Sequence, residues 1–211
     1  MSTQRQPAAR ARTERQRARR RRILDSTTRL AAAGGFDAVQ MREVAESAQV
    51  ALGTLYRYFP SKIHLLVAVL HDQLELLHAT LRERPLPERD PAARVAHTLR
   101  RAFRAHQREP RLTAAMMRAL LFADGSAREE VTAVSRLTSA LLLDAAGLEP
   151  PWSEEELSAV RVIQHTWQST LVFWLAGTVS LENAHADVET ACRLLAGGRR
   201  PPARPQEEPI E

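Results

Sequence analysis

Apolar residues recur at intervals of three and four along most of the chain, and glycine or proline separates the periodic segments. Thr13 and Gln16 form a capping box, no glycine or proline follows as far as residue 33, and Gly34-Gly35 then ends the segment. No stretch alternates apolar and polar residues with the period of two that marks a half-buried strand. The sequence therefore predicts an all-α fold of about nine helices.

The same signals place the other helices. Two short helices are predicted at about 41–48 and 51–58, and Ser61 is the expected N-cap of a longer one that runs to about residue 84. Prolines 85, 87 and 91 then predict a hinge. The later helices are expected to begin at Asp90-Pro91, near residue 112, at the capping boxes Ser126–Glu129 and Ser153–Glu156, and near residue 182; their expected ends are Pro110, Gly125, Gly147 and Gly197-Gly198.

Positive charge is concentrated at the N-terminus. Residues 1–22 hold nine arginines and one glutamate, a charge of +8, whereas the net charge of the whole chain is +5. A basic arm on a mildly acidic body is typical of a protein that binds nucleic acid or an anionic membrane, although a solvated leader would have the same composition. Charge alone therefore leaves the partner open.

Composition further limits the possible classes of protein. The longest apolar run, residues 171–177, is shorter than the ~20 residues that span a bilayer, and no apolar segment of a signal peptide follows the basic N-terminus. The single cysteine, Cys192, excludes an internal disulfide and a multi-thiolate zinc site. We expect a cytoplasmic protein with no membrane partner, no metal and no cofactor.

Residues 40–59 carry the most informative pattern. Val44 and Ala45 can bury one side of a first short helix, and Leu55 and Phe59 can bury one side of a second. A leucine and a tyrosine beside a glycine and an arginine make a poor solvent face but a good surface for the major groove of DNA. That face consists of Leu52, Gly53, Tyr56 and Arg57.

This segment, together with Leu24-Asp25, Gly34-Gly35-Phe36 and Pro60-Ser61-Lys62, resembles the N-terminal domain of TetR-family repressors over about residues 18–70. The resemblance implies a homodimer whose C-terminal domain binds an effector that alters the spacing of two recognition helices. The implied organisation is a disordered basic arm (1–12), a DNA-binding domain (13–64) with its helix-turn-helix at about 40–59, a ligand-binding and dimerisation domain (65–197), and a disordered tail (198–211).

The resemblance also implies which residues contact a double-stranded operator. The residues themselves add two expectations: Gly53 would let the backbone approach the DNA closely, and the charge of the Arg-rich arm would add phosphate or minor-groove contacts. Two positions depart from the family pattern: Gln40 replaces a better N-cap, and His64 replaces a residue that is often acidic. The expected phosphate contacts are Thr54, Tyr56, Tyr58 and Lys62, and the expected base contacts are Arg42, Ala51, Leu52 and Arg57.

A narrower resemblance concerns the effector. Residues 34–42, 56–62 and 64–66, and more loosely 112–116 and 122–124, are similar to the sterol-catabolism repressors of the family. Those proteins respond to CoA thioesters of steroid intermediates. The resemblance therefore implies a small hydrophobic effector, a steroid or fatty acyl-CoA.

Candidate effector and dimer residues follow from the apolar faces of the C-terminal helices, although each alone is more simply explained as core. Arg100, Arg101, Arg104 and Arg118 are candidates for the CoA phosphates. The candidate pocket residues are Phe103, Met116, Met117, Leu120, Leu121 and Phe122, with Trp167, Leu171 and Trp174 across from them. The helix at 154–176 is apolar on more than one side, which favours a dimer interface that includes Phe173, Val188 and Leu195.

Two other classes compete with a DNA-binding regulator. An all-α enzyme lacks support because the sequence has no nucleophile elbow, zinc-protease motif, phosphate loop or dinucleotide fingerprint. His64, His71 and His78 recur every seven residues, but ~10 Å separates neighbours, too far for one metal, so we expect rim or interface histidines. A basic adaptor that binds nucleic acid or membrane without specificity is the other alternative.

Overall fold

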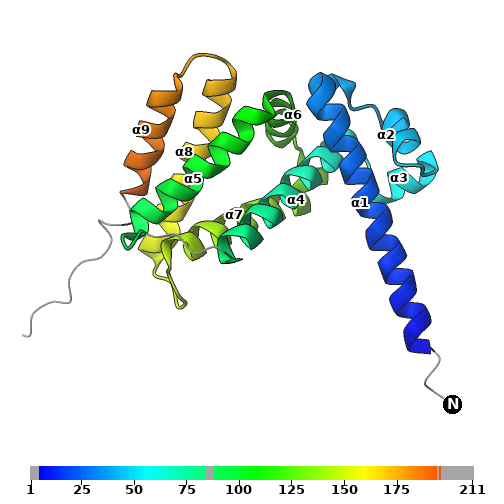
Figure 1. The fold of residues 1–211 in the computed structure, drawn as a ribbon, viewed down its shortest axis with the longest axis horizontal. Helices are drawn as coiled ribbons and strands as arrows, with labels where there is room; N and C mark the ends of the chain where they lie inside the picture. The colour runs from blue at the N-terminus through cyan, green and yellow to red at the C-terminus, as the bar shows by residue number, and fades with distance from the viewer. Residues whose placement is uncertain (1–4, 84–87, 194, 196–211) are drawn as a thin grey trace, which may run out of the picture. The chain divides into compact units, whose positions relative to one another are not determined.

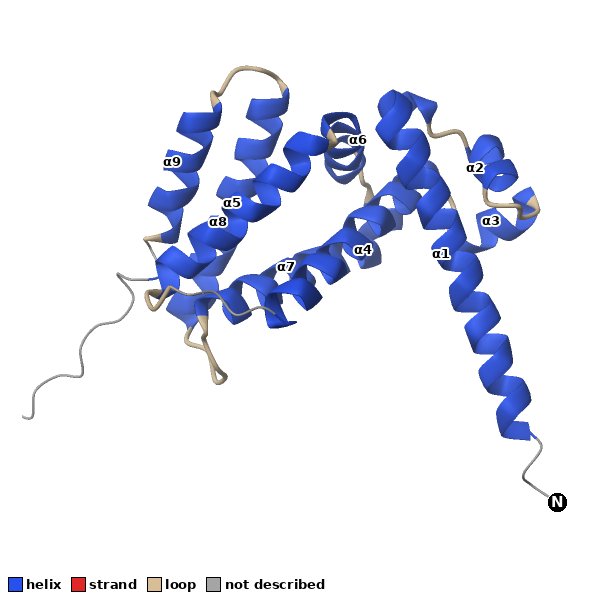
Figure 2. Cartoon of the chain, in the orientation of Figure 1, coloured by secondary structure: helices blue, strands red, loops and turns tan. Residues whose placement is uncertain are grey.

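The computed structural model describes residues 5–83, 88–193 and 195. Throughout these ranges the ordered elements are nine α-helices and one short 3-10 helix, with no strand, which confirms the all-α prediction (Figure 2). The elements are α1 (Arg5–Ala38), α2 (Met41–Ser47), α3 (Leu52–Tyr58), α4 (Lys62–Glu83), α5 (Pro91–Arg108), α6 (Pro110–Leu121), η1 (Gly125–Ala127), α7 (Arg128–Ala146), α8 (Glu154–Leu175) and α9 (Leu181–Cys192).

Helix α1 begins earlier than the sequence predicted. It starts at Arg5 rather than at Thr13, so residues 5–12, which were expected to be a disordered arm, continue the helix (Figure 1). Alanine and arginine are strong helix formers, and Pro7 lies in the first turn, where a missing N–H breaks no intrahelical bond. The predicted glycine stop is confirmed as a kink, because Gly35 has φ of 72°.

Most of the predicted caps are present. Asp90 accepts a 2.8 Å hydrogen bond from the N–H of Ala93, Ser153 and Glu156 form the reciprocal capping box of α8, and Gly147 has the positive φ of a helix stop. The predicted cap at Ser126 is wrong. Asp124 instead accepts from both the N–H (2.9 Å) and the hydroxyl (2.6 Å) of Ser126.

The hydroxyl of Ser126 donates to Asp124 and therefore does not cap α7. Asp124 is instead the N-cap of η1. The same two hydrogen bonds lower the pKa of the Asp124 carboxyl. The predicted hinge prolines at 85 and 87 and the expected end at Gly197-Gly198, with the tail that follows, lie outside the described residues.

The chain forms two compact units, and α5 and α7 each contribute to both. Among the described residues, the first unit comprises residues 5–83 and 102–138; within it α6 packs along α1 and α4, and α2 contacts both α1 and α3. Part of the predicted C-terminal domain therefore belongs to the same unit as the helix-turn-helix. The largest buried side chains of this unit are Ile23, Val39, Val44, Leu55, Leu65, Leu66, Val67, Phe103 and Met116.

Among the described residues, the second unit comprises residues 88–101, 139–193 and 195. Its main helix pair is α8 with α9. Arg100 of α5 forms an ion pair with Glu189 of α9, which ties α5 to the pair. Apolar side chains fill the unit, with Leu142, Ile163 and Leu171 fully buried. No described helix is long and apolar enough to cross a membrane.

His106 of α5 is a partly buried titratable group in the first unit. Its Nδ1 lies 3.1 Å from the hydroxyl of Thr113, and that hydroxyl lies 3.0 Å from the carbonyl of Glu109. Because the threonine proton is directed to a carbonyl, we infer that Nδ1 carries a proton and donates to the hydroxyl oxygen. Burial lowers the pKa of His106 to about 4.

The lowered pKa of His106 makes the free energy of unfolding depend on pH. The folded chain keeps His106 neutral below pH 6.5, where the unfolded chain protonates it, so folding loses stability as the pH falls from 6.5 towards 4. The expected loss reaches about 3 kcal/mol at the acid end. His106→Gln, which keeps an amide donor but does not titrate, should remove this component from urea-unfolding free energies measured between pH 4 and 8. Parallel profiles for the two proteins would contradict the assignment.

Candidate nucleic-acid interface

A tight turn joins α2 to α3. Val44 and Ala45 of α2 are buried, and the N–H of Val50 donates to the carbonyl of Ala45 at 2.9 Å. Gln49, between the two helices, has φ of 54°, in the left-handed region that residues other than glycine rarely adopt. This conformation lets the chain reverse within the few residues between Ser47 and Leu52.

Helix α3 has the two faces that the sequence predicted. Leu55 is fully buried and Phe59, which follows the helix, is nearly so. On the other side the side chain of Tyr56 is 47% exposed, and Gly53 and Arg57 are also exposed. A Cβ built on Gly53 would meet no atom within 4 Å, so packing within the chain does not require glycine there.

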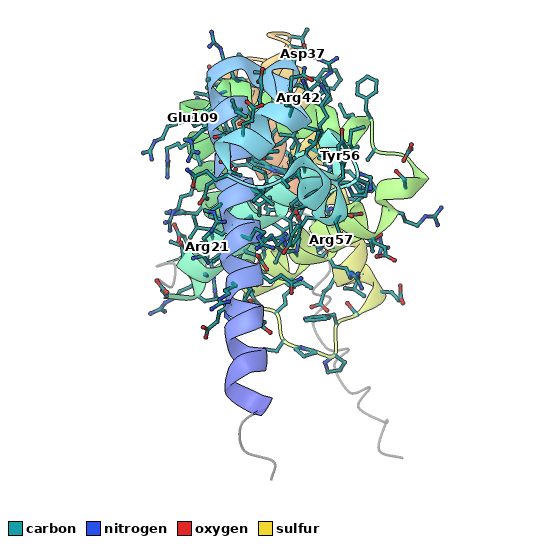
Figure 3. All side chains as sticks on the ribbon, turned by 90° about the vertical axis from the view of Figure 1, so that its right-hand side faces the viewer. Arg21, Asp37, Arg42, Tyr56, Arg57 and Glu109 are labelled. Atoms are coloured by element: carbon teal, nitrogen blue, oxygen red, sulfur yellow. The ribbon has the colours of Figure 1, made fainter. Side chains whose placement is uncertain are left out.

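The other predicted DNA contacts lie around this face. Figure 3 looks onto it, with Arg42 of α2 and Tyr56 and Arg57 of α3 labelled. Arg42 and Ala51 are exposed, and four residues are partly exposed: Leu52, Thr54, Tyr58 and Lys62. Of the nine residues, Ala51 is the N-cap of α3 and the others come from α2, α3 and the start of α4; none is buried.

Lys62 belongs to a cluster that the sequence did not reveal. Its Nζ lies 4.1 Å from the centre of the Phe36 ring, and the guanidinium of Arg118 lies 4.3 Å from the same ring. Arg118 also forms an ion pair with Asp37 at 3.2 Å. Contact with a ring leaves ammonium N–H groups available, so Lys62 can stack and still donate to a phosphate.

This cluster gives Arg118 contacts that the sequence did not indicate. Arg118 is a candidate for CoA phosphates from the sequence, and in the structure it lies in α6 against the end of α1. Arg111, also of α6, donates a 2.6 Å hydrogen bond to the carbonyl of Ala33. No local pattern indicates either contact, because both depend on how α6 packs on α1.

The two departures from the family pattern have structural counterparts. Gln40 makes no side-chain cap to α2 and instead donates to the carbonyl of Asp37 at 2.8 Å. His64 is buried rather than at a rim: its Nδ1 lies 2.9 Å from the hydroxyl of Ser61, and its Nε2 lies 3.2 Å from the carbonyl of Ser126. His64 thereby connects the start of α4 to η1. Among the described residues, no three His, Cys, Asp or Glu side chains are grouped as a metal site would require.

The candidate effector residues divide between the two units. In the first unit Phe103, Met116 and Met117 are buried and Leu120 is partly buried, whereas Leu121 and Phe122 are 66% and 67% exposed. Leu121 and Phe122 follow the buried stretch of α6 and lie outside its core-facing side. In the second unit Trp167 and Leu171 are buried, and Trp174 is partly buried.

The candidate dimer residues differ in how far they are buried. Val188 and Leu195 are buried within the single chain, so neither is available to a partner, whereas Phe173 is 51% exposed. Phe173 lines an open groove of about 630 Å³ between α8 and α9, in the second unit. The other lining residues are Val162, His165, Thr166, Ser169, Thr170, Val179, Asp187, Thr190 and Ala191.

Comparison with known proteins places both halves of the chain. Residues 23–69 match the family described as "Bacterial regulatory proteins, tetR family", and residues 89–195 match "Tetracyclin repressor-like, C-terminal domain". The HTH-type transcriptional repressor KstR of Rhodococcus jostii is 46% identical over 88% of this chain and 87% of its own length.

Two solved structures have the same fold. A TetR transcriptional regulator from Rhodococcus sp. RHA1 has a TM-score of 0.82 and 38% identity, over 88% of this chain and all of the other. Thermus thermophilus FadR, a TetR-family transcriptional repressor in complex with lauroyl-CoA, has a TM-score of 0.66 and 25% identity, over 90% of this chain and all of the other. The chain belongs to the TetR family of bacterial transcriptional regulators.

Proposed function

We propose that this regulator represses transcription as a homodimer on a palindromic operator, and that a hydrophobic CoA thioester releases it. The exposed face of α3 carries the DNA-binding part of the proposal. Tyr56 and Arg57 are held outward by the burial of Leu55 and Phe59, and Gly53 leaves open space beside them. A rigid helix with this face suits the major groove, where an arginine can reach a base or a phosphate.

Substitution of Tyr56 tests whether the exposed face of α3 contacts DNA. Tyr56→Ala should weaken operator binding by about 10- to 100-fold, because a hydrogen bond to a charged phosphate contributes ~1.5–3 kcal/mol. Tyr56→Phe removes the hydroxyl and keeps the ring, so it should lose most of the same binding free energy. Trp152→Ala, which removes another exposed aromatic side chain from the second unit, is the matched control. Unchanged operator affinity of Tyr56→Ala in an anisotropy titration would show that α3 does not present this face to DNA.

The effector part of the proposal is supported by the relatives and by buried apolar residues. The Thermus FadR complex holds lauroyl-CoA in the same fold at 25% identity, and KstR of Rhodococcus jostii is similar over most of both chains. Phe103, Met116 and Met117 are each buried in the first unit, and thioether side chains adapt easily to an apolar ligand. An acyl group, either steroid or fatty, suits such residues.

An operator-release assay separates the two acyl classes. We expect a steroid acyl-CoA thioester to weaken operator binding by about 5- to 150-fold, the usual range of allosteric coupling. Lauroyl-CoA and free CoA serve as comparison ligands in the same anisotropy titration. Release by lauroyl-CoA alone would assign a fatty acyl effector. If neither thioester changed the affinity of a protein that binds its operator tightly, the CoA thioester proposal would be wrong.

The groove between α8 and α9 supports a dimer. Phe173 and Val162 expose apolar surface there, and the partly exposed Val179 and the buried Ala191 also line the groove. Two helices from each of two copies would form a four-helix interface that covers this surface. Because Val188 and Leu195 already belong to the core of one chain, Phe173 is the dimer candidate that a partner could cover.

A charge at Phe173 tests the interface. Phe173→Glu should give monomers in light scattering and weaken operator binding, because a carboxylate would be buried unpaired between the two copies. Leu76→Glu is the matched control, since Leu76 is also an exposed apolar residue but lies in α4. A Phe173→Glu protein that remained dimeric would rule out this part of α8 as the interface.

A further inference from the structure

The N-terminal extension, residues 5–22 of α1, is a helix that carries almost only positive charge. It contains nine arginines and one acid, Glu14. Thr13 to Ala18 are exposed, and from Thr13 onward Ile23 is the first buried residue of the helix. At ~1.5 Å per residue the extension is about 27 Å long. Neither its charge nor its length is needed to fill the core of the first unit.

Contacts near the end of the extension fix it beside α3. The Arg22 Nε donates to the carbonyl of Ala48, in the turn just before α3, at 3.4 Å. The Arg20 guanidinium lies 5.9 Å from the centre of the Phe59 ring, just after α3, and 4.0 Å from Asp72 of α4. The extension therefore contacts the residue that ends α2 and the residue that follows α3, and these contacts set its direction relative to α3.

The remaining arginines continue away from these contacts. Arg15 and Arg19 lie seven and three residues before Arg22, so they share its side of the helix, the side nearest the helix-turn-helix. Arg17 and Arg21 lie on another side, and Arg15, Arg17 and Arg21 are all exposed (Figure 3 labels Arg21). The N-terminal extension thus carries positive charge away from the contacts beside α3.

We propose that the N-terminal extension binds the phosphate backbone of the same DNA duplex, next to the half-site that α3 contacts. The inference rests on the proposed role of α3 and extends it. B-DNA carries one negative charge per ~1.7 Å of its axis, so a rigid cationic helix can neutralise several phosphates without reading sequence. A membrane surface fits less well, because residues 13–22 have no apolar face to insert.

Two matched triple variants test this proposal. Arg15→Ala/Arg17→Ala/Arg21→Ala removes three exposed arginines from the extension, and alanine preserves the helix. Arg108→Ala/Arg128→Ala/Arg136→Ala removes three exposed arginines from α5 and α7 in the same unit, so the change in net charge is identical. Circular dichroism and thermal unfolding should show that both variants stay folded.

The measurement is the slope of log K against log salt concentration, for an operator duplex and an unrelated duplex. The slope should become shallower by about 0.9 for each phosphate that the variant no longer neutralises, up to ~2.7 per subunit for the extension variant. Affinity should fall by the same factor on both duplexes, and hydroxyl-radical protection should shrink beside the half-site. The control variant should keep the wild-type slope.

Each other outcome has a definite meaning. An unchanged slope for the extension variant, or an equal change for the control, would overturn the proposal. So would an unchanged DNA slope combined with a failure to bind phosphatidylglycerol vesicles that the wild-type protein binds, which would assign the extension to a membrane surface. If the wild-type protein did not prefer its operator but the slope still became shallower, the proposed role of α3 would fail while phosphate binding by the extension would stand.

Discussion

The burial of Leu55 and Phe59 is the constraint on which the DNA-facing surface depends. A helix as short as α3 is not stable alone in water, so it exists because its apolar side packs into the first unit. Each such side chain contributes ~1.5–3 kcal/mol when it is fully buried. Since the two residues are four apart, their burial also sets the rotation of the helix. Tyr56 and Arg57 are then directed outward as a geometric consequence.

The surroundings of α3 reinforce that orientation from several sides. The left-handed Gln49 sets the angle of entry, and Arg22 of α1 holds the turn from the N-terminal side. On the other side of the unit, α6 contacts the end of α1 through Arg111 and through the stack of Arg118 on Phe36. Lys62 shares that ring, so a residue proposed to bind phosphate touches the same side chain as a residue of α6.

Local signals in the sequence were sufficient for much of this structure. The helix boundaries near Gly35, Asp90, Gly147 and Ser153 depend on residues a few positions apart, and the structure confirms them. The two faces of α3 follow from the helical period in the same way. These features could be predicted because residues a few positions apart in the sequence indicate them.

The errors arise where packing between helices decides the outcome. The contacts of Arg118 with Phe36 and Asp37 could not be predicted, because the sequence does not indicate that α6 lies on α1, and its suggested contact with CoA phosphates stays a prediction. Val188 and Leu195 have the spacing of an interface, but their own chain buries them. The start of α1 was misplaced for a different reason: a capping box at Thr13 is a strong signal, yet a helix continues through it when the preceding residues are good helix formers.

The central claim is that the protein recognises a specific DNA site through α3 rather than binding any polyanion through its charge. An anisotropy titration of a duplex from upstream of the protein's own gene, with unrelated duplex as competitor and salt varied, tests it most directly. The account predicts tight, competitor-resistant binding that saturates at two or four chains per site. Weak binding that is equal for both duplexes and is abolished by modest salt would contradict it.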